Sequence, residues 1–134
     1  MTEQTTPFAP HFSLDELRCQ CGCSASPEVV ERLRALSWAL ERGFRAPIGL
    51  PVIVTSGHRC KAHNNAIGGA GSSRHIHGDA ADIKILGLSG ERLAGWAECQ
   101  IEHGVIPQGG VGTYHAHPGL LHYDMRGTHA RWSK

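Results

Sequence analysis

Apolar residues recur at helical spacing in the first third of the chain. The longest predicted helix has its apolar stripe at Val29, Leu33, Leu36 and Leu40. Ser26 is a good N-cap and Pro27 suits the first helical position, so this helix is expected to begin there. Gly43 is expected to end it.

Two further helices are indicated by their first residues. Ser13 and Glu16 have the spacing of a capping box, in which each side chain accepts the other residue's backbone N–H. This predicts a short helix that ends before Gly22. Ser89 is expected to cap a third helix, with its buried stripe at Leu93, Trp96, Ala97 and Ile101.

Runs of β-branched and other apolar residues predict four strands, over residues 51–55, 79–85, 109–114 and 120–125. A turn at residues 117–119 is expected to join the last two strands. Residues 56–78 are rich in glycine and form a long loop-like stretch, which in a compact domain is usually functional. Helices first and then strands with one helical insertion predict an α+β fold with a small, mainly antiparallel sheet.

Length and charge narrow the classes of protein. The 134 residues fit a single domain spanning residues 1–134, expected to be monomeric. A net charge of +1 gives no basic field for nucleic acid. No stretch approaches the roughly 20 apolar residues of a membrane span, so no membrane insertion is expected. The start, Met1–Pro7, lacks the features of a signal peptide, so we expect the chain to stay in the cytoplasm where it is made.

Five cysteines are unevenly placed: Cys19, Cys21 and Cys23 alternate, while Cys60 and Cys99 stand apart. An odd count without a signal peptide argues against a secreted disulfide framework. The Cys-x-Cys-x-Cys spacing differs from the Cys-x2-Cys spacing of strong zinc motifs. We therefore favour reduced, packed thiols over a structural zinc on the trio plus Cys60 or a disulfide involving Cys60.

The chemistry of the chain is indicated by three residues, His75, Asp82 and His122. Two imidazoles and one carboxylate are a sufficient set of protein ligands for one catalytic zinc ion, with the fourth position left for water. Their spacing excludes the helical His-x3-His geometry of the commonest zinc peptidases, so the ligands must come from a loop and two strands. The set predicts a metal-dependent hydrolase.

The pattern Ser73-x-His75-x2-Gly78-x-Ala80-x-Asp82, followed by His122, resembles the signature of the zinc D-Ala-D-Ala carboxypeptidase family, peptidase family M15. Relatives of that family include phage endolysins, murein endopeptidases and the hedgehog signalling domain. Segments 12–17, 56–64, 110–114 and 122–126 also resemble the short, single-domain members, so the likeness extends from about residue 11 to about residue 132. It implies the hedgehog/DD-peptidase fold.

The resemblance also implies roles for the residues. His75, Asp82 and His122 would hold zinc, and Arg59 would bind or polarise the substrate near the scissile bond. Ser73 and Tyr114 are expected to complete the substrate site. The implied substrate is a peptidoglycan stem peptide, cut by a D-Ala-D-Ala carboxypeptidase or a cross-link endopeptidase. The small size resembles a phage or prophage endolysin, which would reach the cell wall through a holin or within a virion.

The general base is not assigned by the resemblance. Several relatives carry a glutamate three residues before the last histidine ligand, but here that position is Gly119. Asp124 is the first candidate, because it lies two residues after His122 on a predicted strand and therefore on the same face. His117 and His115 are alternatives on the adjoining turn.

Two other classes of function stay open. Some proteins of this fold keep the zinc site yet act through protein contacts, so a zinc-containing, non-catalytic binding module is the main alternative. A redox or metal-storage protein built on Cys19, Cys21 and Cys23 is the other.

Overall fold

The protein is an α+β domain built on one five-stranded sheet, as predicted. The computed structural model describes residues 7–71 and 73–134. The strands are β1 (Ile53–Ser56), β2 (Ala80–Lys84), β3 (Gly110–Tyr114), β4 (His117–Asp124) and β5 (Ala130–Ser133). Their order in the sheet is β1-β2-β4-β3-β5, and every pairing is antiparallel except that between β3 and β5.

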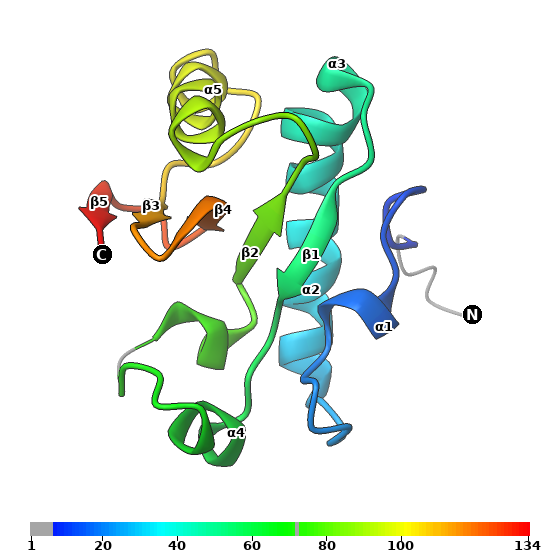
Figure 1. Ribbon diagram of the computed structural model, residues 1–134. Coiled ribbons are helices and arrows are strands. Elements are labelled where there is room, and N and C mark those ends of the chain that lie inside the picture. Colours follow the sequence, from blue (N-terminus) through cyan, green and yellow to red (C-terminus); the bar gives the residue numbers. More distant parts are fainter. Residues whose placement is uncertain (1–6, 72) are drawn as a thin grey trace, which may run out of the picture.

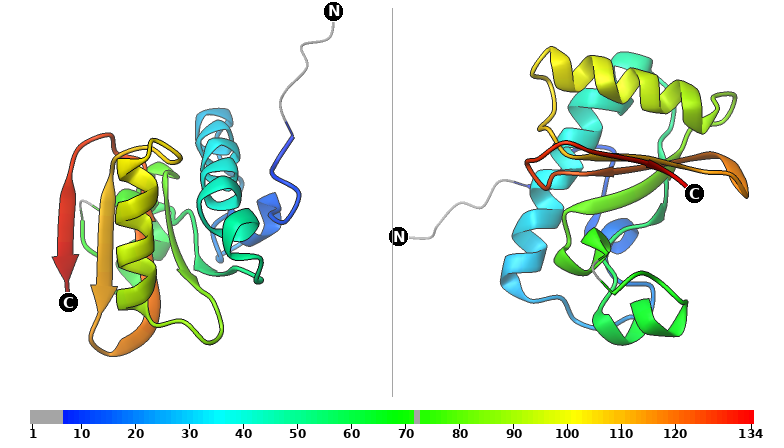
Figure 2. Two further views of the ribbon diagram at one scale, coloured as in Figure 1. Left: turned by 90° about the horizontal axis from the view of Figure 1, so that it is seen from above. Right: turned by 90° about the vertical axis from the view of Figure 1, so that its left-hand side faces the viewer.

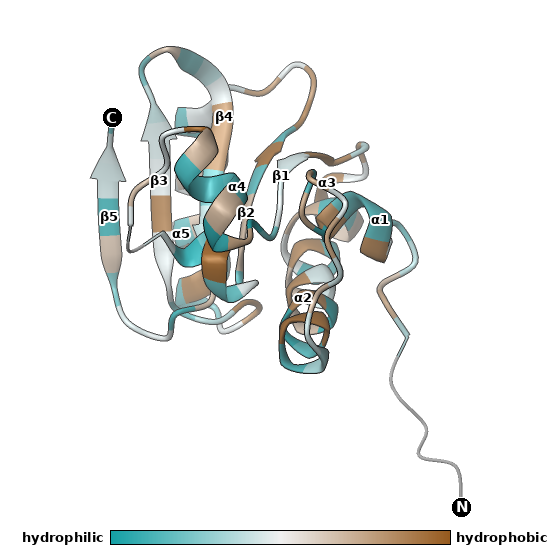
Figure 3. Ribbon diagram, turned by 90° about the horizontal axis from the view of Figure 1, so that it is seen from below, coloured by the Kyte–Doolittle hydropathy of each residue, from teal (hydrophilic) through white to brown (hydrophobic). Residues whose placement is uncertain are grey.

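The helical segments are α1 (Leu14–Leu17), α2 (Pro27–Leu40), η1 (Glu41–Arg45), α3 (Ala46–Ile48), α4 (Lys61–Ala66), η2 (Arg74–His77) and α5 (Gly90–Glu102). Figures 1 and 2 show α2 and α5 on one side of the sheet and α4 on the other. The hydrophobic core lies on the α2 and α5 side, where apolar stripes of the helices meet Ile83, Leu121 and Tyr123 (Figure 3). The opposite face of β2 and β4 is therefore left for other chemistry. No helix within the described ranges is long and apolar enough to cross a membrane.

The predicted helix starts are confirmed. Ser13 and Glu16 form both bonds of the capping box, and Ser26 and Ser89 each accept a backbone N–H at the start of their helices. The predicted stop at Gly43 is wrong. The helix continues through η1 and α3 and ends at Gly49, whose φ of 77° is the left-handed conformation that favours glycine.

Gly43 has a packing role instead. It is buried, and a Cβ at this position would lie 2.6 Å from a methyl carbon of Ile106. Its carbonyl accepts hydrogen bonds from Trp96 and Gln100 of α5. The absence of a side chain at Gly43 therefore lets η1 pack closely against α5.

Three details of the later chain differ from the prediction. The long stretch 56–78 contains α4 and η2, which are too short to show helical periodicity. The turn before β4 falls at residues 115–116, because β4 already begins at His117, which pairs with Tyr114. β5 was not predicted, since its four residues alternate weakly and it pairs only at the edge of the sheet, with β3.

Candidate metal centre and substrate cleft

The three expected ligands converge on the face of the sheet opposite the core. Asp82 and His122 are direct cross-strand partners in the β2–β4 pair, and His75 reaches them from η2. His75 Nε2 lies 3.4 Å and His122 Nδ1 lies 3.3 Å from Asp82 Oδ1. A tetrahedral zinc site with bonds of about 2.0–2.1 Å places neighbouring ligand atoms about 3.3 Å apart. The spacing therefore fits a zinc ion, and we call these three residues the metal centre.

His75 has one ring nitrogen satisfied and one free. Its side chain is 2% exposed, and Nδ1 lies 2.7 Å from the carbonyl oxygen of Gly57, to which it can only donate. This fixes the tautomer and leaves Nε2 as an acceptor. Nε2 is buried and has no hydrogen-bond partner among the described residues. A buried, unpaired acceptor facing a carboxylate oxygen fits the role of a metal ligand.

His122 is held by Asp124 from the side away from the metal centre. His122 Nε2 lies 2.7 Å from Asp124 Oδ2, so Nδ1 is the nitrogen directed at Asp82. Asp124 is fully buried and accepts further hydrogen bonds from the backbone of Gly110 and from Arg126. Burial opposes its ionisation, but Arg126 and His122 outweigh burial and keep the pKa of Asp124 well below its usual range. Asp124 therefore orients the imidazole as a carboxylate behind a metal-binding histidine does.

Asp82 is held in the ionised form that a metal ligand needs. Burial opposes its charge, yet the neighbouring imidazoles of His122 and His75 keep the pKa of Asp82 far below the ordinary value. Tyr114 donates its hydroxyl to Asp82 Oδ1 at 2.8 Å. Burial and the charge of Asp82 raise the pKa of Tyr114, so the phenol stays protonated and stays a donor.

Two glycines of β3 make space for this arrangement. A Cβ on Gly110 would lie 2.2 Å from Asp124 Oδ2, and a Cβ on Gly112 would lie 2.3 Å from the indole ring of Trp132. With these side chains absent, Asp124 reaches the Gly110 backbone and Trp132 packs against His122, with ring centroids 5.0 Å apart. The Gly-x-Gly pattern of this strand thus serves the site.

A cleft of about 730 Å³ opens over the metal centre. Arg59, Ser73, Tyr114 and His117, four residues expected at the site, line it. Asp124 does not line the cleft, because it is buried behind His122. His115 does not line it either; its ring lies 3.5 Å from the hydroxyl of Ser133. The roles proposed for these residues from sequence stay predictions, but their positions separate the cleft wall from the support behind it.

Several residues of the cleft wall were not predicted from sequence, among them Arg74, Arg126, Trp132 and Lys134. Trp132 lies on β5 and Lys134 directly follows it. The short, weakly alternating sequence of β5 did not reveal this strand. Arg126 could have been found, because an arginine two residues after Asp124 on an extended segment points the same way as the carboxylate.

One comparison with known proteins gives a match. A family model described as Peptidase M15 matches residues 10–124, which is most of the chain. The matched range contains all three residues of the metal centre. No curated protein matches the sequence.

Proposed function

The chain belongs to the peptidase M15 family, and from this premise we propose that it is a zinc-dependent peptidase that hydrolyses peptidoglycan stem peptides. Membership of the family makes it a metallopeptidase; the zinc ion and the substrate are the proposal. The observation that carries the proposal is the unpaired, buried Nε2 of His75 facing Asp82. With His122 Nδ1 it gives two nitrogen ligands and one oxygen ligand around a position that opens into the cleft.

When bound, a zinc ion polarises a peptide carbonyl and lowers the pKa of its water to about 7. The protein's own residues supply the orientation. Gly57 fixes the ring of His75, and Asp124 fixes the ring of His122, so both imidazoles present the correct nitrogen without rearrangement. Tyr114 holds the carboxylate of Asp82 from the cleft side.

The charges of the cleft wall support a substrate with a free carboxylate. Two lining arginines are paired, Arg74 with Asp79 and Arg126 with Asp124. Arg59 also lines the cleft, and its guanidinium has no hydrogen-bond or ion-pair partner in the part of the chain that the structure describes. A guanidinium with free donors binds a carboxylate in a bidentate manner. This feature favours a D-Ala-D-Ala carboxypeptidase over a cross-link endopeptidase, because the former must recognise a chain-terminal carboxylate.

His117 is the residue we propose to move the proton. Asp82 is the only carboxylate among the described residues that line the cleft, and it belongs to the metal centre. The oxygens of Asp124 are already taken by His122, Arg126 and Gly110. His117 is exposed at the start of β4 and lines the cleft, so its imidazole can exchange protons near the scissile bond.

One observation keeps a second function open. The glutamate that several relatives carry is replaced by Gly119, and Asp82 is the sole carboxylate of the described cleft wall. A zinc-containing, non-catalytic module that binds peptide in the cleft would also have this wall. The setting we propose for either function is a phage or prophage lysis system acting on the cell wall.

The test is digestion of purified peptidoglycan with products identified by mass spectrometry, using wild type and His122→Ala. We expect wild type to release D-alanine and the variant to release none. Loss of cross-linked dimers without D-alanine would instead show an endopeptidase. A zinc-loaded wild type that binds several wall types and cuts none of them would support the binding module.

The proton-transfer role needs its own comparison, between His117→Ala and His115→Ala. We expect the first to lower kcat and to change the pH profile of activity, since the imidazole lines the cleft. The second is the matched control, because His115 is a neighbouring histidine outside the cleft wall. Equal activities in the two variants would remove His117 from the reaction.

A further inference from the structure

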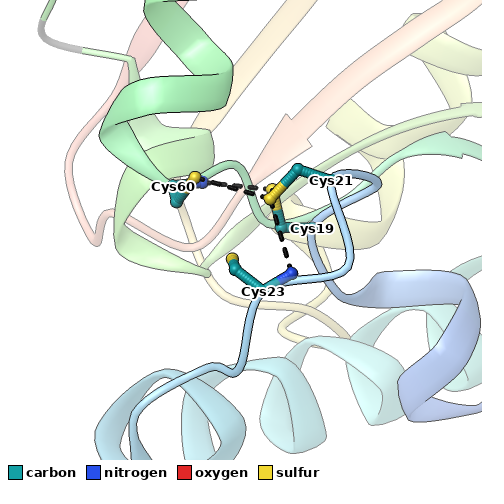
Figure 4. A group of neighbouring side chains, drawn as sticks. All are labelled: Cys19, Cys21, Cys23 and Cys60. Atoms are coloured by element: carbon teal, nitrogen blue, oxygen red, sulfur yellow. Dashed lines mark hydrogen bonds between the residues drawn. The ribbon is translucent and has the colours of Figure 1, made fainter.

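Four cysteine side chains from two distant segments meet beside α4 (Figure 4). Cys19, Cys21 and Cys23 come from the segment between α1 and α2, and Cys60 comes from the end of the segment that follows β1. Their four sulfur atoms all lie within 4.8 Å of one another. We call these four residues the cysteine cluster. Cys99 is exposed on α5 and lies outside it.

The sulfur spacing fits a metal site better than disulfides. Cys19 Sγ lies 3.3 Å from Cys21 Sγ, which lies 3.7 Å from Cys60 Sγ. A tetrahedral zinc site with Zn–S bonds of about 2.3 Å places its sulfurs about 3.8 Å apart. A disulfide requires about 2.05 Å between two sulfurs and leaves the other pair separate. Here all four sulfurs gather around one point, and none of the described cysteines is paired.

Backbone N–H groups are directed at three of the four sulfurs. The N–H of Cys60 points at Cys19 Sγ, that of Cys23 at Cys21 Sγ, and that of His63 at Cys60 Sγ, at 3.3–3.4 Å. Such donors stabilise a sulfur atom that carries negative charge, and they are the usual support behind metal-bound thiolates.

A tight turn lets Cys19, Cys21 and Cys23 face one centre despite their unusual spacing. Gly22 stands between Cys21 and Cys23 with a φ of 82°, and its N–H bonds the carbonyl of Cys19 at 3.1 Å. A left-handed residue at this point reverses the chain, so that alternate cysteines face one centre. Cys-x-Cys-Gly-Cys is therefore a local arrangement that delivers three sulfurs, and Cys60 completes it from the other segment.

We propose that Cys19, Cys21, Cys23 and Cys60 form a structural zinc site, separate from the metal centre. Four thiolates fill the coordination of the ion, and closed four-cysteine sites of this kind are structural rather than catalytic. In the ionised form, four thiolates would need a cation at the centre of the cluster, and thiolates select zinc over magnesium or calcium.

The site would fix the segment that supports the metal centre. Gly57, which accepts the Nδ1–H of His75, and Arg59 of the cleft wall both lie within three residues of Cys60. The backbone N–H of Arg59 also bonds the carbonyl of His75 at 2.9 Å. An ion held by Cys60 and the trio would clamp this segment to the chain around Leu17, whose carbonyl accepts the N–H of His58 at 2.7 Å.

The experiment measures zinc per chain by elemental analysis, in protein purified under reducing conditions. We expect about two ions in wild type and in the control Cys99→Ser, and about one ion in two variants. These are the fourfold Cys19→Ser, Cys21→Ser, Cys23→Ser, Cys60→Ser variant and the double variant His75→Ala, His122→Ala. One ion in wild type that survives the fourfold substitution would overturn the proposal, and so would disulfides among the four cysteines in non-reducing mass spectra.

The result also separates this proposal from the peptidase proposal. A wild type with one ion that only the histidine substitutions remove keeps the peptidase proposal and rejects the cysteine site. One ion that only the cysteine substitutions remove does the reverse.

A second measurement covers the case in which the fourfold variant does not fold. Cobalt replaces zinc in the folded double variant His75→Ala, His122→Ala, where the cysteine cluster is intact. We expect the intense thiolate-to-cobalt charge-transfer absorption of a four-sulfur site. A folded double variant that takes up cobalt without this absorption, or takes up none, would reject the site.

Discussion

The metal centre and the cysteine cluster are connected by the segment of residues 57–60, in which Gly57 contacts His75 and Cys60 belongs to the cluster, yet they are built in different ways. Two ligands of the metal centre stand in register on adjacent strands, and its imidazoles are held by Gly57 and Asp124. The cysteine cluster is made from two segments without strands, and several of its thiols are partly or fully exposed. The side chains of the first site are held by hydrogen bonds from the fold behind them, whereas those of the second contact mainly backbone N–H groups and one another.

The two sites also differ in the number of protein ligands. Three protein ligands leave a position open toward the cleft, which a catalytic ion requires, and four thiolates leave none. Removal of metal should therefore cost activity at one site and stability at the other.

Brief treatment with a chelator should remove the ion of the open site first. We expect activity to fall by about a thousandfold or more, because the Lewis acid is lost, while the thermal midpoint changes little. Activity assays and calorimetry on one sample give both values, and added zinc should restore turnover. A large fall in the midpoint together with activity would contradict the idea that the sheet preorganises this site.

Asp124→Asn should lower the zinc affinity of the metal centre by about 10- to 100-fold, because the amide no longer fixes His122 as the carboxylate does. Competition with a chromophoric chelator measures the affinity. Asp79→Asn is the matched control, since it also removes a buried carboxylate from an arginine but has no contact with His122. Equal losses of zinc affinity in both variants would show that the loss comes from breaking an arginine–carboxylate ion pair and not from the contact between Asp124 and His122.

Cys60→Ser should act mainly through stability. Loss of one thiolate from a structural zinc site is expected to cost about 3 kcal/mol and to lower the thermal midpoint by about 10 °C in a domain of this size. Activity should fall by about tenfold as the segment carrying Gly57 and Arg59 loosens. Calorimetry and peptidoglycan digestion measure the two effects, and Cys99→Ser should change neither. A midpoint equal to that of wild type would remove the stabilising role of the cluster.

The smallest effect is expected for Tyr114→Phe. The change removes one hydrogen bond to Asp82, which is worth about 1 kcal/mol, so activity should fall by about fivefold. Zinc content should stay as in wild type, and the thermal midpoint should fall by about 3 °C. A loss as large as that produced by chelation would place the hydroxyl in the reaction itself, in contact with substrate.

The parts of the fold that were predictable have strong local signals. Serine caps and apolar stripes fixed the starts of the helices, and Gly43 misled because its role is long-range packing against Ile106. β5 was missed because an edge strand of four residues carries little periodicity. Because β5 was missed, Trp132, which lies on this strand and packs on His122, was missed as well.

The meeting of His75, Asp82 and His122 was predictable because their residue types and spacing are unusual in combination. The position of Asp124 on the same face as His122 also followed from strand geometry. The burial of the Asp124 side chain could not be predicted, since it depends on Gly110 of a different strand. The cysteine cluster was the hardest to predict. Its fourth member, Cys60, is 37 residues from Cys23 in sequence, and only the folded chain brings the two together.

The register of β2 against β4 makes the metal centre a check on folding. Successive residues of a strand point to opposite faces, so sliding β4 by one residue would turn His122 toward the core and bring Leu121 or Tyr123 to the cleft. A mispaired chain would have no site for the ion and no activity. Zinc at this position would therefore proofread strand pairing, binding only molecules whose sheet has assembled correctly.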